Sequence, residues 1–180
     1  MIFVAFLAEI FGDWSRLWLS YDRDGIAAGQ AWRLLTGHFV HLSPSHLLLN
    51  AAGLLLVWLL VGGSASTARW LLLAAGSIFG IDAGLWVLAP RLDWYVGLSG
   101  LLHGLLAAGI VAELRGGRRD TWILAGLVLG KLTYEQFSGP LPGSEASAGG
   151  TVIVEAHLFG AICGALTAVF LPVSPRHGSI

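Results

Sequence analysis

Residues 96–104 read VGLSGLLHG, which places a serine between glycines at the point where an apolar run begins. A hydroxyl buried in hydrocarbon without a hydrogen-bond partner costs roughly 2 to 7 kcal/mol. Ser99 therefore predicts an acceptor aimed at it from another segment. The best candidate is His157, which lies near the start of a second apolar run, EAHLFGAICG, at residues 155–164. If both runs are helices in contact, the serine and the histidine meet inside an apolar bundle.

The composition is that of a polytopic membrane protein. Of the 180 residues, 56% are hydrophobic and 12% are charged, and 8 are tryptophan, whereas about a quarter of an ordinary soluble domain is charged. This apolar composition makes a lipid bilayer the expected partner. The net charge is only -1 and no basic run of five or more occurs, so nothing indicates a nucleic-acid partner or an electrostatic lipid patch. The single cysteine, Cys163, excludes a disulfide framework and a cysteine-based metal site.

The hydrophobic pattern predicts an all-α fold in a single membrane domain over residues 1–180. Residues 1–11 would form a partial first helix of about 16 Å, short of a hydrocarbon core of about 30 Å, and no basic region marks them as a signal peptide. Residues 12–45 interleave charges with tryptophan and tyrosine, which is typical of a long loop with short helices lying in the membrane interface. Five membrane helices are predicted at residues 45–61, 68–89, 96–112, 121–137 and 152–171.

The joints between the predicted helices differ in charge. Basic residues occupy the joints after the second and fourth helices and the C-terminal tail, namely Arg69, Arg115, Arg118, Arg119 and Arg176. The positive-inside rule predicts that these joints are cytoplasmic, although the loop at residues 12–45 also carries arginines. The serine end of the fourth helix then opens toward the periplasm. Ser99 would be recessed below that surface, so hydrolysis there requires a water-filled cavity.

Helical spacing brings small residues to one face of each of the two key helices. The pairs are Gly100 with Gly104, and Gly160 with Gly164. Small residues at this spacing let two backbones approach closely in a membrane. Close approach is the condition for hydrogen bonding between Ser99 and His157, after which the histidine can act as general base and later as general acid.

The second predicted helix offers donors for a developing oxyanion. His46, Asn50 and Gly53 lie at i, i+4 and i+7, and so share a face. Both polar side chains can point toward the serine. Losing one oxyanion donor typically costs about 100- to 1,000-fold in rate.

These motifs occur together in one order along the chain: Trp32-Arg33, His41, His46, Asn50, the GLSG of residues 97–100, and Ala156-His157 followed by Gly160 and Gly164. In this the sequence resembles the rhomboid family of intramembrane serine proteases. The resemblance implies a six-helix bundle with a long interfacial loop after the first helix. It further implies that Ser99 is the nucleophile, that His157 is its base, and that His46 and Asn50 hold the oxyanion. Neither a metal nor a cofactor is expected.

Two further stretches, WRLLTGH at residues 32–38 and KLTYEQFSGP at residues 131–140, resemble the rhombosortases of Gram-negative bacteria. That resemblance implies an enzyme of the bacterial inner membrane that cleaves anchored, exported proteins. Its substrates would carry a C-terminal Gly-Gly motif, a membrane helix and a basic tail, and the new end could be transferred to a lipid-derived amine. His103 stands where ordinary bacterial rhomboids often have a tyrosine. Residues predicted to bind substrate or support the site are Arg33, His41, His103 and Glu135.

Other interpretations remain open at this stage. The protein could be a rhomboid protease with a broader substrate range. It could instead be a transporter, because intramembrane ionisable residues also line ion paths, and such residues are present as Asp82, Lys131, Glu135 and Glu155. Lys131 and Glu135, at i and i+4, either neutralise each other or bind substrate. A metal site at His38, His41 and His46 is disfavoured because no HExxH motif occurs.

Overall fold

The computed structural model describes residues 1–172, which are mainly helical, so that Arg176 of the orientation argument lies outside the described residues. The helices are α1 (Ile2–Ile10), α2 (Asp13–Leu19), α3 (Arg23–Ala27), α4 (Arg33–Thr36), α5 (Pro44–Val61), α6 (Thr67–Leu88), α7 (Ser99–Arg115), α8 (Thr121–Ser138), α9 (Ser144–Ala148) and α10 (Val154–Phe170). Two short strands, β1 (Tyr21–Asp22) and β2 (Trp94–Tyr95), pair antiparallel. Single 3₁₀ turns follow α4 and α5, at Gly37–Phe39 and Gly62–Ser64.

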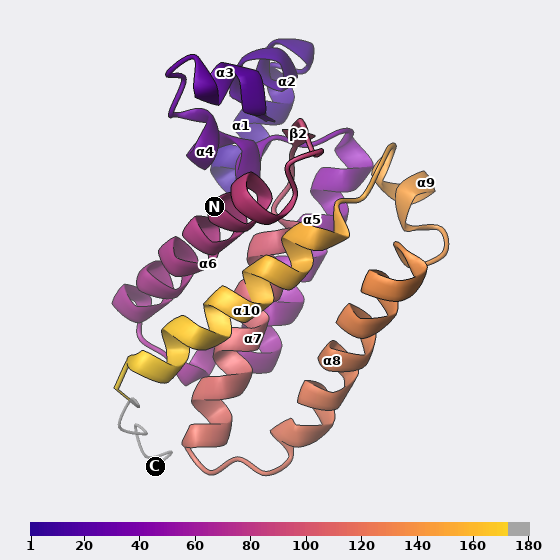
Figure 1. Cartoon of the computed structure of the whole chain (residues 1–180). Helices are drawn as coiled ribbons and strands as arrows, with labels where there is room; N and C mark the ends of the chain where they lie inside the picture. The colour runs from indigo at the N-terminus through magenta and orange to yellow at the C-terminus, as the bar shows by residue number, and fades with distance from the viewer. Residues whose placement is uncertain (173–180) are drawn as a thin grey trace.

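Helix α7 is the centre of the bundle and contacts α5, α6, α8 and α10 (Figure 1). Its closest neighbour is α10, because glycines on both helices let the two backbones come into contact. A side chain on Gly160 would collide with the carbonyl of Gly100, and one on Gly164 would collide with the carbonyl of Gly104. The predicted close approach of the two glycine faces is therefore confirmed.

Helix α6 completes the core against α7 and α10. Ser77 of α6 fills the space beside Gly104, and Gly80 and Gly84 receive the side chains of Cys163 and Phe159 from α10. Cys163 is thus a packing residue between two helices. These small residues bring three helices together at the end of the bundle where α7 begins and α10 begins.

The fourth predicted helix differs most from the structure. It was expected over residues 96–112, but α7 runs from Ser99 to Arg115. Residues 94–95 pair with Tyr21 and Asp22 as a strand, and Gly97 has a positive φ of 113°, which helical backbone does not allow. The other four ranges agree with α5, α6, α8 and α10 to within a few residues. The helix α9, between α8 and α10, was not predicted.

Among the residues that the structure describes, two helices are long and apolar enough to cross a membrane, Pro44–Ser64 and Thr67–Leu88, and Val154–Phe170 is a shorter apolar helix. Large apolar side chains are also exposed along α8, including Ile123, Leu127 and Phe137. In Figure 1, α8 stands at the side of the bundle. Such outward apolar faces match a lipid environment, where there is no water to avoid.

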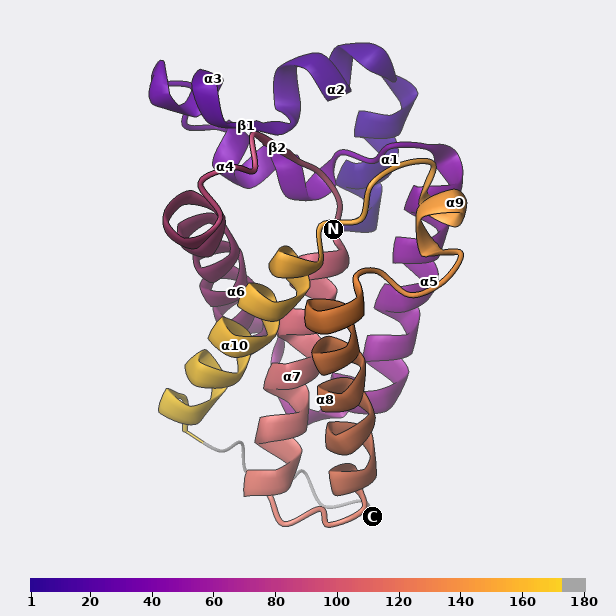
Figure 2. The ribbon, with the colours of Figure 1, turned by 45° about the vertical axis from the view of Figure 1, so that its right-hand side comes forward.

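The segment predicted as a long interfacial loop with short helices does contain short helices, together with one short strand. It contains α2, β1, α3 and α4, which gather over one end of the bundle (Figure 2). Arg33 is buried there and donates hydrogen bonds to the carbonyls of Ser20 and Leu17 and to the side chain of Gln30. Arg23 joins the segment to α6 by donating to the carbonyls of Leu85 and Ala89 at its C-terminal end. This region forms a fixed cover at the serine end of α7.

Candidate active site

The structure brings Ser99 and His157 into contact. Ser99 is the first residue of α7, and His157 lies in the first turn of α10. The Oγ of Ser99 and the Nε2 of His157 are 3.0 Å apart, which is hydrogen-bond distance. His157 is buried, whereas Ser99 is partly exposed. The hydroxyl is therefore both paired with an imidazole and open to an approaching group.

A carboxylate lies behind the histidine. The Nδ1 of His157 is 3.0 Å from the Oε2 of Glu135 on α8, and the Nζ of Lys131 is 2.7 Å from the same oxygen. The predicted ion pair between Lys131 and Glu135 is thus present. The sequence analysis did not predict the contact between Glu135 and His157, which lies between the Lys131–Glu135 ion pair and the Ser99–His157 hydrogen bond. The only available signal was that two ionisable residues share one face of an otherwise apolar helix.

His103 stacks on His157. Their ring centroids are 4.3 Å apart and the rings are inclined by 19°. The Nδ1 of His103 donates to the carbonyl of Ser99 at 2.7 Å, one helical turn earlier. This contact fixes the His103 ring, and the stack in turn limits the rotation of His157.

The residues before Ser99 face the start of α5. Gly97 has a φ of 113°, and a side chain there would lie 2.8 Å from the His46 ring and 3.8 Å from the Asn50 amide nitrogen. Within residues 1–172, the buried Nδ2 of Asn50 has no hydrogen-bond partner. The Nδ1 of His46 accepts from the Leu42 N–H at 3.4 Å, which leaves Nε2 as the protonated nitrogen. Two unused donors therefore lie beside the backbone that leads into Ser99.

The Gly97 turn is held from both sides. The Tyr95 hydroxyl donates to the Gly97 carbonyl at 2.7 Å, and the Gly97 N–H donates to the Gly37 carbonyl at 3.1 Å. Burial raises the pKa of Tyr95, so its hydroxyl stays protonated as the donor. The shape of this turn depends on β2 and on residues 60 positions earlier in the chain.

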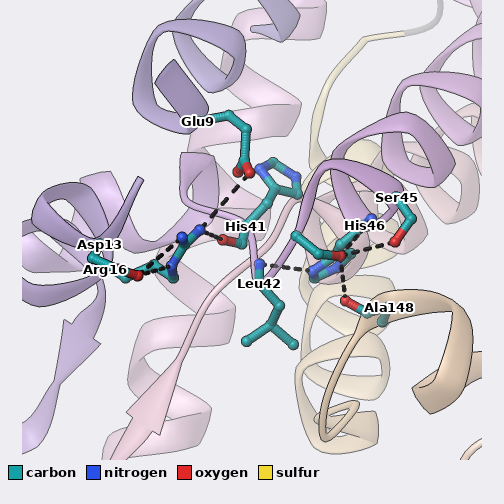
Figure 3. A network of polar contacts seen from close by, with 9 residues as sticks. Glu9, Asp13, Arg16, His41, Leu42, Ser45, His46 and Ala148 are labelled. Carbon is teal, nitrogen blue, oxygen red and sulfur yellow. Dashed lines mark hydrogen bonds and ion pairs between the residues drawn. The ribbon is translucent and has the colours of Figure 1, made fainter. Parts of the chain in front are cut away.

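A polar network anchors the segment that enters α5 (Figure 3). Arg16 donates to the His41 carbonyl at 3.2 Å and lies 3.1 Å from Asp13 and 3.8 Å from Glu9. The His41 ring is buried edge-on against His46, with centroids 5.0 Å apart. Burial and the neighbouring His46 lower the pKa of His41 to about 4, so it is uncharged at neutral pH. His41 thus packs against the His46 ring and supports the residue that lies beside Gly97.

The segment before α10 is attached to the N-terminus of α5 through Ser43. Ser43 caps α5 by accepting from the His46 N–H at 3.2 Å, and its hydroxyl donates to the carbonyl of Ala148 at 2.8 Å. Ala148, His46 and His41 are seen together in Figure 3. Arg33, another predicted site residue, is instead occupied with the carbonyls of the α2–α4 region.

His103, Glu135 and His157 have the spacing of a possible metal site, because one ligand atom from each lies within 4.8 Å of the others. Two features disfavour a cation. Lone pairs of imidazoles lie in the ring plane, so the stacked rings do not converge on one point. The ammonium of Lys131 already holds the carboxylate. These contacts suit the positioning of the His157 ring better than metal binding.

The fold and these contacts define a helical membrane protein with a serine and a histidine paired at the meeting point of two glycine-rich helices. The Rhomboid domain family matches residues 28–173, and the chain belongs to the rhomboid family. It is also 30% identical over 157 residues to the Bacillus subtilis (strain 168) protein named "Putative rhomboid protease YdcA", covering 84% of this chain and 72% of that protein. Family membership implies a membrane-embedded serine protease.

Proposed function

We propose that this protein cleaves peptide bonds with Ser99 as nucleophile and His157 as general base. The observation that carries this assignment is the distance of 3.0 Å between Ser99 Oγ and His157 Nε2. A serine is a weak nucleophile until an adjacent base accepts its proton, and this contact supplies that base.

The reaction follows from these positions. The Ser99 oxygen attacks the scissile carbonyl while its proton passes to Nε2 of His157. The resulting imidazolium then protonates the leaving amine, which departs and leaves an acyl group on Ser99. Water, or another amine, then attacks that ester while His157 accepts its proton, and the bond between the acyl carbon and Ser99 Oγ breaks as His157 returns the proton to that oxygen.

The oxyanion of the tetrahedral intermediate would be held by Asn50 and His46. Both present donors beside Gly97, two residues before the nucleophile. Ser99 is the first residue of α7, so its N–H is among those that have no partner within the helix, and the helix dipole favours an anion there. Donors fixed before the reaction stabilise charge without reorganising.

The substrates would be exported proteins anchored by a C-terminal helix, with a Gly-Gly motif before the helix and a basic tail after it. The support is the resemblance of residues 32–38 and 131–140 to rhombosortases. The enzyme would lie in a bacterial inner membrane with Ser99 open to the periplasm. The support is that Arg69 near the start of α6, Arg115 at the end of α7 and Arg118 just after α7 lie away from the serine end of the bundle. Mass spectrometry of the new C-terminus would distinguish hydrolysis from transfer to a lipid-derived amine.

The test uses Ser99→Ala, His157→Ala and the double variant with a membrane-anchored reporter. We expect each single variant to lose nearly all turnover and the double to lose no more, because a nucleophile and its base act as one unit. Near-normal turnover by either single variant would end the proposal.

A second measurement separates a protease from a transporter. A serine-directed phosphonate should add one adduct to the parent protein, mapped to Ser99, and none to Ser99→Ala. A transporter has no activated serine and would give no adduct. A protein that labels but cuts reporters without Gly-Gly would be a rhomboid of broader range.

A further inference from the structure

We propose that Glu135, held in place by Lys131, is a positioning residue that orients His157, so that the Ser99–His157 pair is part of a line of four contacting side chains. This inference rests on the proposed function, because it concerns the efficiency of the same histidine. The ion pair between Lys131 and Glu135 on α8 would then position His157 in addition to neutralising two charges.

The geometry is that of a line of contacts. Lys131 Nζ is 2.7 Å from Glu135 Oε2, the same oxygen is 3.0 Å from His157 Nδ1, and His157 Nε2 is 3.0 Å from Ser99 Oγ. Glu135 is 3% exposed and His157 is 4% exposed. Bulk water therefore does not separate the carboxylate from the imidazole, and their attraction is strong.

The ammonium of Lys131 keeps Glu135 in its charged form. A charged carboxylate only accepts hydrogen bonds, so Nδ1 of His157 must carry the proton and donate it. The lone pair of the ring is then on Nε2, facing the Ser99 hydroxyl. The carboxylate thus selects the one tautomer in which His157 can act as a base toward Ser99.

Glu135 also acts while the reaction proceeds. When the Ser99 proton moves to Nε2, the ring becomes an imidazolium with both nitrogens protonated. The negative charge of Glu135 stabilises that cation, while Nδ1 keeps its proton and the carboxylate stays unprotonated. The proton on Nε2 later goes to the leaving amine, which returns His157 to its neutral form while Ser99 carries the acyl group.

A merely structural ion pair does not account for this arrangement. Removing two charges from water is costly, and a buried pair is often no more stabilising than apolar residues of the same size. Glu135 lies instead where one oxygen bridges Lys131 and the proposed base, and His103 confines that base from the ring face. The three contacts restrict the position, the rotation and the tautomer of His157.

The test compares kcat and KM for Glu135→Gln, Glu135→Asp and Lys131→Met in the full-length protein. Replacing the corresponding acid by its amide in a soluble serine protease lowers kcat by about 10⁴-fold. We expect Glu135→Gln to lower kcat by roughly 10²- to 10⁴-fold with KM unchanged. Glu135→Asp, which keeps the charge, should recover at least about tenfold of that loss, and Lys131→Met should have a smaller effect.

The matched control is Glu113→Gln. This carboxylate also pairs with a cation, Arg118 at 2.9 Å, but at the far end of α7. It should keep kcat. Thermal melting of each purified variant identifies loss of fold, and end-point titration with a phosphonate gives the concentration of reactive serine used to normalise kcat.

The outcomes are distinct. A kcat for Glu135→Gln within threefold of the parent would overturn the inference, as would a raised KM with unchanged kcat, which marks substrate binding. If Asp and Gln variants lose kcat equally while both melt early, Glu135 is structural and the inference is wrong. Full activity of Ser99→Ala would instead overturn the proposed function.

Discussion

At the level of single residues, the Asn50 amide is the clearest sign of a built site. Its nitrogen is buried and, among the described residues, is unpaired. An unsatisfied buried donor costs about 1 to 3 kcal/mol. A position that tolerates this cost is explained if the donor is paired during the reaction, when an oxyanion forms beside Gly97.

Asn50→Ala should therefore lower turnover by about 100- to 1,000-fold and leave the melting temperature nearly unchanged. The phosphonate should still reach Ser99, because the nucleophile and its base remain. Turnover of the anchored reporter and end-point labelling measure the two effects. Unchanged turnover would show that Asn50 serves packing and that the oxyanion is held elsewhere.

His41 is a second residue whose burial has a measurable consequence. Its pKa is about 4 in the folded protein and 6.5 when unperturbed. Between pH 6.5 and about 4, His41 is protonated in the unfolded chain but not in the folded protein. The free energy of unfolding therefore decreases as the pH falls through this range. This gap corresponds to about 3 kcal/mol.

His41→Phe, which keeps a buried ring but cannot take a proton, should reduce the acid sensitivity of the fold. We expect the parent's melting temperature to drop more between pH 7 and pH 5 than that of the variant. Thermal melts in the same detergent at both pH values provide the comparison. Equal drops would show that His41 does not contribute to acid sensitivity.

At the level of helices, the contact between α7 and α10 positions the proposed catalytic pair, Ser99 and His157. Ser99 and His157 come together because Gly160 lies directly on the Gly100 carbonyl and Gly164 on the Gly104 carbonyl. Backbone cannot move aside as a flexible side chain can. Any side chain at these positions must separate the two helices, which also lengthens the distance between serine and histidine.

Gly160→Ala should destabilise the protein by about 1 to 3 kcal/mol through overpacking and should also lower turnover in the protein that remains folded. Gly130→Ala is the matched control, since nothing lies within 4 Å of the added carbon on α8. It should be neutral or stabilising by up to about 1 kcal/mol from helix propensity. Equal melting temperatures for both variants would argue against a tight α7–α10 contact.

At the level of the whole molecule, access to Ser99 limits which substrates fit. Ser99 is the first residue of α7, at the end of the bundle where the α2–α4 region gathers (Figure 2), and the hydrogen bond from Ser43 to Ala148 ties α9 to the start of α5. Under the proposed function, a substrate helix would have to unwind to present its carbonyl there. Glycine is a poorer helix former than alanine by about 1 kcal/mol and allows close backbone approach.

Reporters with Gly-Gly, Ala-Ala and Leu-Leu before the same membrane helix should be cut in that descending order. Cleavage followed in identical membranes measures the preference, and Ser99→Ala provides the background. If all three are cut equally, the Gly-Gly specificity is wrong, although intramembrane proteolysis would stand.

Much of this molecule could be predicted from sequence because its signals are local. Apolar runs and their flanking residues located α5, α6, α8 and α10, and helical spacing identified the glycine faces. The pairing of Ser99 with His157 was predictable because each is a polar residue near the start of an apolar helix with glycines at matching positions. Burial without a partner would be costly for both, so the pairing satisfies two requirements at once.

The rest depended on contacts between distant segments, which no local pattern encodes. The start of α7 at Ser99 is decided by the β1–β2 pairing and the positive φ of Gly97, whose N–H is held by Gly37. Spacing showed that Lys131 and Glu135 share a face, but only the packing of α8 against α7 and α10 determines that Glu135 meets His157. The helical period determines which residues share one face of a helix. Which residues of other helices that face contacts is determined by tertiary packing.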